Sequence, residues 1–193
     1  MLDGLTDLNV PRFYALAAIY HIGEEDIGRR RLADEIGLTE SKTRTMLGHM
    51  RDAGLITAEE TLSLAPAGEE VYTALVDTVK AVSEVDLSYF AVDEVCRAAL
   101  LSGVTVDNEV AVRDEAIRGG ATGMTVLQYD QQFRFPSEPD SLPERNEAHA
   151  DLDVLDATFQ TAVEGDVLFI VSADAEETVV AGLWRAIFSV MPV

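Results

Sequence analysis

The sequence predicts an α+β protein of two domains, one covering residues 1–84 and the other residues 85–193. Residues 29–56 have the pattern of two short helices joined by a tight turn. From about residue 86, short apolar segments alternate with amphipathic ones, which is typical of an α/β domain, here expected to have a mixed sheet. With 193 residues, 48% of them hydrophobic, the chain can bury a core in each domain.

The helix–turn–helix prediction for residues 29–56 depends on residue spacing. Leu32, Ala33 and Ile36 give the first helix a buried stripe. Gly37 suits the turn because glycine adopts a positive φ at little cost. Thr39 is a good N-cap for the second helix. That helix is expected to bury the face formed by Thr43, Met46, Leu47 and Met50, at positions i, i+3, i+4 and i+7.

The opposite face of the second helix carries small, hydrogen-bonding or cationic side chains, which suit a DNA major groove. The same window holds six basic residues against four acidic ones, in a chain of net charge −21. A local excess of positive charge in such a chain indicates a polyanionic partner, and we expect double-stranded DNA. The predicted contacts are Arg29, Arg30 and Arg31 at phosphates and Ser41, Lys42, Arg44, Thr45 and His49 in the groove.

The segment LADEIGLTESKTRTMLGHMRDAGLI, residues 32–56, resembles the winged helix–turn–helix of bacterial and archaeal transcription regulators. The resemblance extends over residues 10–84. It implies DNA binding. Within that stretch, the residue pattern predicts a helix from Pro11 to about His21 and a wing hairpin of residues 56–57 and 62–64. The segment from Ala58 to Thr61 departs from the family because it is short and acidic where a wing usually carries Arg or Lys. Winged helices also serve as protein–protein interaction modules, so that alternative stays open.

Residues 66–84 are predicted to form one long helix that begins at Pro66. Tyr72, Leu75, Val79 and Val82 follow a 3, 4, 3 spacing, as in the seam of a coiled coil. A regulator that reads palindromic DNA is a dimer, so this helix is the expected homodimer contact. The alternative is that the seam packs against its own chain.

The second domain is predicted from alternating apolar segments and turn signals. Residues 137–149 are polar and contain prolines, which predicts a loop. The run of residues 167–171 is apolar throughout, which predicts a buried central strand. The expected elements are strands 87–92, 95–101, 124–129, 132–135 and 167–171, and helices 109–118, 152–163 and 175–191. For residues 95–101 a helix is the alternative.

The segment VRDEAIRGGATGMTVLQY, residues 112–129, resembles a C-terminal domain of unknown function that archaeal proteins carry behind a winged helix. The resemblance implies a cytoplasmic transcription regulator and implies no reaction. The glycines follow a helix, so their first interpretation is a helix C-cap. The functional interpretation is a pocket for a small anionic metabolite, in which Arg113 binds the anion beside Gly120, Thr122 and Gly123.

An enzyme is not predicted, because the sequence has no nucleophile motif or phosphate-binding loop. Acidic pairs such as Asp151 and Asp153 are interpreted as hydrated surface. The single cysteine, Cys96, is expected to be a buried structural thiol. The three histidines are scattered, which predicts no metal site, and no cofactor is expected. A small-metabolite enzyme domain fused to a winged helix remains the alternative.

Cellular location is predicted from the absence of two patterns. The start of the sequence lacks a basic region followed by an apolar core, and no apolar run is long enough to span a bilayer, so we expect a cytoplasmic protein. The 35 acidic residues and only two lysines suggest adaptation to a salt-rich cytoplasm, where screening weakens self-repulsion. The alternative is an ordinary acidic protein.

Overall fold

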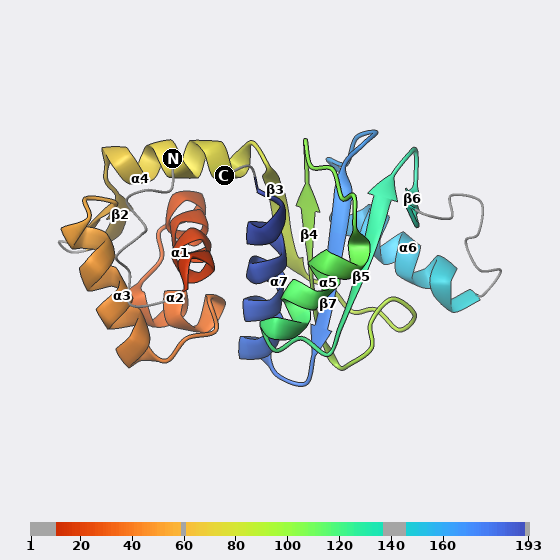
Figure 1. Cartoon of the computed structure of the whole chain (residues 1–193), viewed down its shortest axis with the longest axis horizontal. Helices are drawn as coiled ribbons and strands as arrows, with labels where there is room; N and C mark the ends of the chain where they lie inside the picture. The colour runs from red at the N-terminus through yellow and green to blue at the C-terminus, as the bar shows by residue number, and fades with distance from the viewer. Residues whose placement is uncertain (1–10, 59–60, 137–145, 192–193) are drawn as a thin grey trace. The chain divides into compact units, whose positions relative to one another are not determined.

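The computed structural model describes residues 11–58, 61–136 and 146–191 (Figure 1). The chain is an α+β protein that divides into two compact units, with the division between Val76 and Asp77 rather than after residue 84. Among the described residues, no helix has both the length and the apolar character needed to cross a membrane.

The first unit consists of three helices, a two-stranded hairpin and a fourth helix. Its fully buried side chains come from the helices, from β1 and from the segments next to α2, with Leu16, Leu32, Met46, Ile56 and Leu75 among them. The elements are α1 Arg12–Glu24, α2 Arg29–Glu35, α3 Glu40–Asp52, β1 Ile56–Ala58, β2 Leu62–Leu64 and α4 Pro66–Val76.

The predicted turn between α2 and α3 is confirmed. Gly37 has φ of 66°, in the left-handed region, and Thr39 caps α3 by accepting a hydrogen bond from the Lys42 amide at 3.4 Å. The predicted apolar face of α3 is also confirmed, because Thr43, Met46, Leu47 and Met50 are all buried. This packing fixes which side of α3 faces solvent.

The predicted long helix and its dimer seam are wrong. The α4 helix ends at Val76, and Val79 and Val82 lie on a strand of the second unit. Leu75 is fully buried, and the Tyr72 hydroxyl donates a hydrogen bond to Glu24 Oε1 at 2.7 Å. The valine spacing fits a helix, but β-branched residues also favour strands, and long-range pairing decided between the two.

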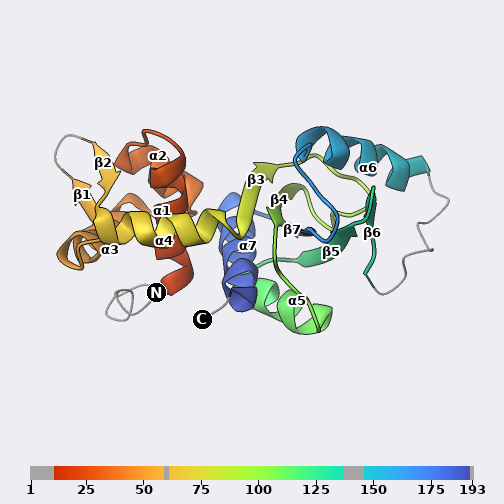
Figure 2. The same cartoon turned by 90° about the horizontal axis from the view of Figure 1, so that it is seen from above.

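The second unit is built on a five-stranded sheet of strand order β3-β4-β7-β5-β6 (Figure 2). Its strands are β3 Val79–Glu84, β4 Val95–Leu101, β5 Gly123–Tyr129, β6 Phe133–Arg134 and β7 Val167–Ala173. Its helices are α5 Glu109–Arg118, α6 Asn146–Thr158 and α7 Glu176–Val190. All seven residues of β7 are buried, which confirms the predicted central strand.

The expected mixed sheet is corrected by the strand pairing. Each pairing in the five-stranded sheet is antiparallel. Both β4 and β5 are antiparallel to β7, so β4, α5 and β5 form a parallel crossover whose two strands are separated by β7. Alternation along the sequence predicts such crossovers, but it does not reveal that a later strand lies between them.

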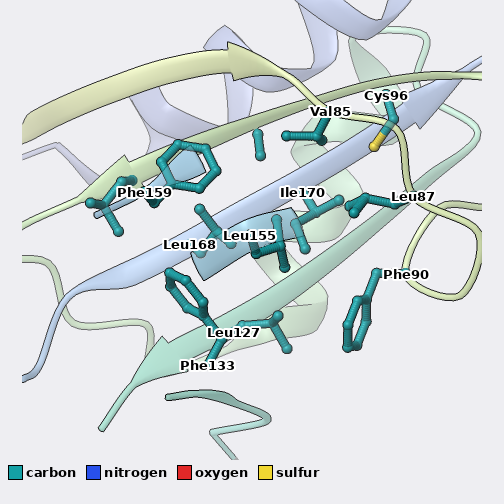
Figure 3. Packing of buried hydrophobic residues seen from close by; sticks show 12 residues of the cluster. Val85, Leu87, Phe90, Cys96, Leu127, Phe133, Leu155, Phe159, Leu168 and Ile170 are labelled. Carbon is teal, nitrogen blue, oxygen red and sulfur yellow. The ribbon is translucent and has the colours of Figure 1, made fainter. Parts of the chain in front are cut away.

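The two faces of the sheet are covered differently. Figure 2 shows α5 and α7 on one face and α6 on the other. The expected strand over residues 87–92 is absent, and Val85, Leu87 and Phe90 instead belong to an irregular segment that packs into the core beneath α6. Figure 3 shows this core, in which Leu155 of α6 and Phe159, the residue after α6, meet side chains of the sheet such as Leu127, Leu168 and Ile170.

Cys96 is buried in this core, as predicted, with 3% of its surface exposed. Burial, followed by the negative charges of Asp151 and Asp86, raises the pKa of the Cys96 thiol to about 12. Because the thiolate is the reactive form, Ellman's reagent at pH 8 should modify the folded protein roughly 100-fold more slowly than the urea-unfolded chain. Equal rates in the two states would contradict this burial.

The raised pKa of Cys96 also makes the free energy of unfolding depend on pH. The folded state keeps the thiol proton to higher pH than the unfolded chain does, so this group lowers the free energy of unfolding as the pH rises from about 9 towards 12.

Candidate nucleic-acid interface

The solvent-facing side of α3 carries most of the predicted groove contacts. Ser41, Lys42, Arg44 and Thr45 are exposed, and His49 is partly buried. The Thr45 hydroxyl donates to the Ser41 carbonyl oxygen at 3.1 Å, so its proton is used within the helix. What α3 offers to a partner is therefore mainly the cations and the Ser41 hydroxyl.

The three consecutive arginines at the start of α2 have different surroundings. The Arg31 guanidinium pairs with Glu25 at 2.8 Å, and Arg30 lies 3.9 Å from Glu40. Both arginines are well exposed, and surface ion pairs of this kind contribute little to stability. Each arginine can therefore leave its acidic partner and bind a phosphate. Arg29 instead faces a cleft.

This cleft lies between the start of α2, α3 and β2, and its volume is about 450 Å³. Three arginines line it: Arg29 from α2, and Arg44 and Arg51 from α3. Gly48 lies between the last two along the helix, and a Cβ there would touch nothing within 4 Å. We call this feature the arginine cleft; its other lining residues are Asp26, Ile27, Gly28, Leu47, Thr61 and Leu62.

The sequence prediction of site residues omitted Arg51. Helical spacing could have identified Arg51, because Arg44, Gly48 and Arg51 are spaced i, i+4 and i+7 and so share one side of a helix. What spacing could not show is that Arg29, from another helix, lines the same cleft. That meeting depends on how α2 packs against α3.

The predicted pocket of the second unit is not assembled as expected. Arg113 is exposed on α5 and lines a hollow of about 200 Å³ with Glu109, Val110, Met124, Thr125, Val126 and Phe135. Neither Gly120, Thr122 nor Gly123 lines this hollow. The Thr122 hydroxyl donates instead to Asp93 Oδ2 at 3.1 Å, and a Cβ on Gly123 would lie 2.6 Å from a methyl carbon of Val92.

The glycine turn after α5 serves helix capping and helix packing. Gly120 has φ of 105°, and the Gly119 amide donates to the Ala116 carbonyl oxygen at 2.9 Å, as in a helix C-cap. A Cβ on Gly119 would lie 2.6 Å from the Gly182 Cα of α7. These glycines allow α5 and α7 to approach each other closely, a role that the sequence prediction missed although Gly182 lies within the apolar stretch of residues 179–184.

Charged groups also join α5 to α7. Glu115 accepts a hydrogen bond from Arg185 Nε at 2.8 Å and pairs with Arg118. The hydrogen bond from Arg185, reinforced by both arginine charges and opposed by burial, holds the pKa of Glu115 below its usual value. Glu115 of α5 therefore helps to dock this helix on α7 through Arg185.

Within residues 11–58, 61–136 and 146–191, no group of three or more histidine, cysteine, aspartate or glutamate side chains is arranged to hold a metal ion.

The protein is thus an α+β chain with a cationic cleft in its first unit. Its second unit matches a known family. Residues 94–190, just over half of the chain, match the family described as Domain of unknown function (DUF4443), and the chain belongs to that family. None of the curated proteins matches the sequence.

A solved structure is similar over nearly the whole length of the chain. It is the hypothetical protein PH0730 from Pyrococcus horikoshii OT3, with a TM-score of 0.77 and 19% sequence identity. The similarity covers 94% of this chain and 93% of that chain. At this level of identity, the two proteins share a fold, and nothing about function follows.

Proposed function

We propose that the first unit is a winged helix that binds double-stranded DNA and that the protein is a cytoplasmic transcription regulator. The observation that carries this proposal is the exposed cationic face of α3, with Lys42 and Arg44 held outward by a fully packed opposite face. In a chain of net charge −21, such a face suits a phosphate backbone and base edges.

The proposed docking places α3 in the major groove. Arg44 and Ser41 then meet base edges, while Arg30 and Arg31 contact phosphates from the start of α2. The acidic segment between β1 and β2 does not suit the minor groove, so the proposal assigns no base contact to the hairpin.

The proposal is tested first by Arg44→Ala. Loss of a bidentate contact to guanine should weaken specific binding by about 1–3 kcal/mol, or roughly 5- to 150-fold. Fluorescence anisotropy with a duplex from the protein's own promoter, titrated at several KCl concentrations, measures this change. Arg30→Ala and Arg31→Ala should instead weaken binding to all duplexes and reduce the salt slope by about one each.

A matched control is Arg118→Ala, which removes the same charge from an exposed position on α5 in the second unit. It should leave duplex binding unchanged. If the correctly folded wild type binds no duplex at low salt, the DNA proposal fails and the protein–protein interaction module becomes the better explanation of the α3 face. If Arg44→Ala and Arg118→Ala behave alike, Arg44 is not the base-reading residue.

The proposal includes a homodimer and an effector. Palindromic operators require two copies, although the predicted helical seam does not exist to supply the contact. Light scattering in molar KCl measures the number of copies. The hollow beside Arg113 supports a small anionic metabolite as effector, and a thermal-shift screen comparing wild type with Arg113→Ala tests it. A fused small-metabolite enzyme remains the alternative for the second unit.

A further inference from the structure

We propose that the arginine cleft of the first unit is a nucleotide-binding site, in which the arginines hold a phosphate group and the apolar side receives the sugar–base body. The phosphate could come from a free nucleotide or from a nucleotide of a DNA duplex, and the chemistry of recognition is the same. Nucleotide binding by this cleft does not depend on the proposed function; only its effect on DNA binding rests on it.

Electrostatics is the first argument for this site. Arg29, Arg44 and Arg51 bring three guanidinium groups to one cleft, and among its described lining residues the acidic one is Asp26. Like charges gathered in a concave site repel each other, and this repulsion is relieved when an anion lies between them. Guanidinium groups match phosphate oxygens through paired N–H donors, so a phosphate is the best-fitting anion.

None of the described contacts neutralises this cluster. Within the described parts of the chain, Arg51 pairs with its neighbour Asp52 at 3.8 Å, and both side chains are more than half exposed. A surface pair of this kind is weak and leaves the guanidinium donors available to a ligand. Arg30 and Arg31, whose partners are on other elements, do not line the cleft.

The shape and the remaining lining residues favour a nucleotide over a simple anion. The cleft volume of about 450 Å³ is within the usual range for small-molecule sites. Ile27, Leu47 and Leu62 give it an apolar wall, which suits a base and sugar better than inorganic phosphate. The exposed Asp26 carboxylate can accept hydrogen bonds from sugar hydroxyls.

A free nucleotide in this cleft would affect DNA binding directly. Arg44 lines the cleft and also lies on the face of α3 that is proposed to read the major groove. A phosphate in the cleft and a guanine edge in the groove both use the Arg44 guanidinium, which would have to point to a different place for each, so we expect the two ligands to compete. This control needs no conformational change, because the ligand occupies a group that DNA requires.

Isothermal titration calorimetry of the full chain with AMP tests the site, with adenosine and inorganic phosphate as partial ligands. We expect AMP to bind with a dissociation constant below about 1 mM, which corresponds to about 4 kcal/mol, and each partial ligand to bind at least tenfold more weakly. Arg51→Gln and Arg29→Gln should each weaken AMP binding at least tenfold. Arg118→Gln, the matched control, should not change it.

A second arm measures duplex binding with the same variants and with added AMP. If AMP binds through Arg29 and Arg51 and displaces the duplex, the site takes a free nucleotide. If AMP does not bind but Arg51→Gln weakens duplex binding more than tenfold while Arg118→Gln does not, the site holds a backbone nucleotide. The inference is overturned if neither AMP nor duplex binding responds to Arg29→Gln and Arg51→Gln.

The two arms also separate this inference from the proposed function. AMP binding without any duplex binding would sink the DNA proposal and keep the nucleotide site. If duplex binding depends on Arg44 but does not respond to Arg29→Gln, Arg51→Gln or AMP, the DNA proposal is kept and the nucleotide site is rejected. Circular dichroism of each variant confirms that it is folded, and the exposed positions of Arg29 and Arg51 make that the expected result.

Discussion

Replacing Asp151 with alanine is expected to lower the free energy of unfolding of the second unit by about 3–5 kcal/mol, because it removes a buried charge that holds several donors. Asp151 lies on α6 with 3% of its surface exposed. Its carboxylate accepts hydrogen bonds from the backbone amides of Ser88 at 3.0 Å, Tyr89 at 2.7 Å and Phe90 at 2.9 Å. The Ser88 hydroxyl adds another at 3.3 Å.

The expected loss of stability is large because one carboxylate accepts hydrogen bonds from three consecutive backbone amides. The segment that it holds carries Leu87 and Phe90 into the core beneath α6. Without the carboxylate, three amides lose their acceptor: those of Ser88 and Tyr89 are part-buried and that of Phe90 is buried. An unsatisfied buried donor costs about 1–3 kcal/mol. Asp151→Asn should be intermediate, since an amide keeps one acceptor oxygen but places a donor against a backbone N–H.

Urea unfolding followed by tryptophan fluorescence measures this effect. Trp184 is the single tryptophan, is 2% exposed and lies in α7 of the second unit. Asp153→Ala, on the exposed side of the same helix, is the control, and its effect should be within about 0.5 kcal/mol. Similar losses for Asp151→Ala and Asp153→Ala would show that the buried hydrogen bonds do not stabilise the fold.

Asp151 also illustrates what the sequence could not predict. The pair of Asp151 and Asp153 was interpreted as hydrated surface, which is wrong for Asp151. Its partners lie 61 to 63 positions away along the chain, and no local pattern links such distant residues. An acidic residue in a helix is usually solvated, so burial becomes visible only when the packed backbone is known.

The first unit was more predictable, because its elements are set by local spacing. The apolar positions of α2 and α3, the Gly37 turn and the Thr39 cap all follow from residues within one or two helical turns. The strand β3 was missed for the opposite reason. Its pairing partner is β4, and the spacing of Val79 and Val82 fits a helix as well as a partly buried strand.

The candidate site was predictable as a face but not as a cleft. The α3 face follows from helical periodicity, and its groove contacts were predicted from residue type. Arg51 shares a side of α3 with Arg44, yet the depth of the site depends on β2 and on the start of α2. In the second unit, the glycines suggested a ligand loop, whereas Gly119 allows a close contact with Gly182.

Lys80→Met is expected to lower the free energy of unfolding by about 3 kcal/mol, because it leaves a buried carboxylate without its cation. Lys80 Nζ lies 2.7 Å from Asp166 Oδ2 and also donates to the Thr161 carbonyl oxygen at 3.0 Å. The Asp166 side chain is 2% exposed and keeps one other donor, the Val163 amide at 2.9 Å. The pair therefore ties the edge strand β3 to the loop before β7.

A double-mutant cycle with Asp166→Leu distinguishes loss of the pair from loss of packing. If the penalty comes from an unpaired buried charge, Lys80→Met/Asp166→Leu should recover most of the stability that Lys80→Met loses. An additive double variant would contradict a specific pair.

Repeating the cycle in molar KCl adds a second comparison, because buried pairs are screened much less than exposed charges. The coupling energy should stay nearly constant while the wild type becomes more stable with salt, since screening relieves the self-repulsion of a chain with net charge −21. A wild type that gains no stability with KCl would instead favour the ordinary acidic protein over salt adaptation.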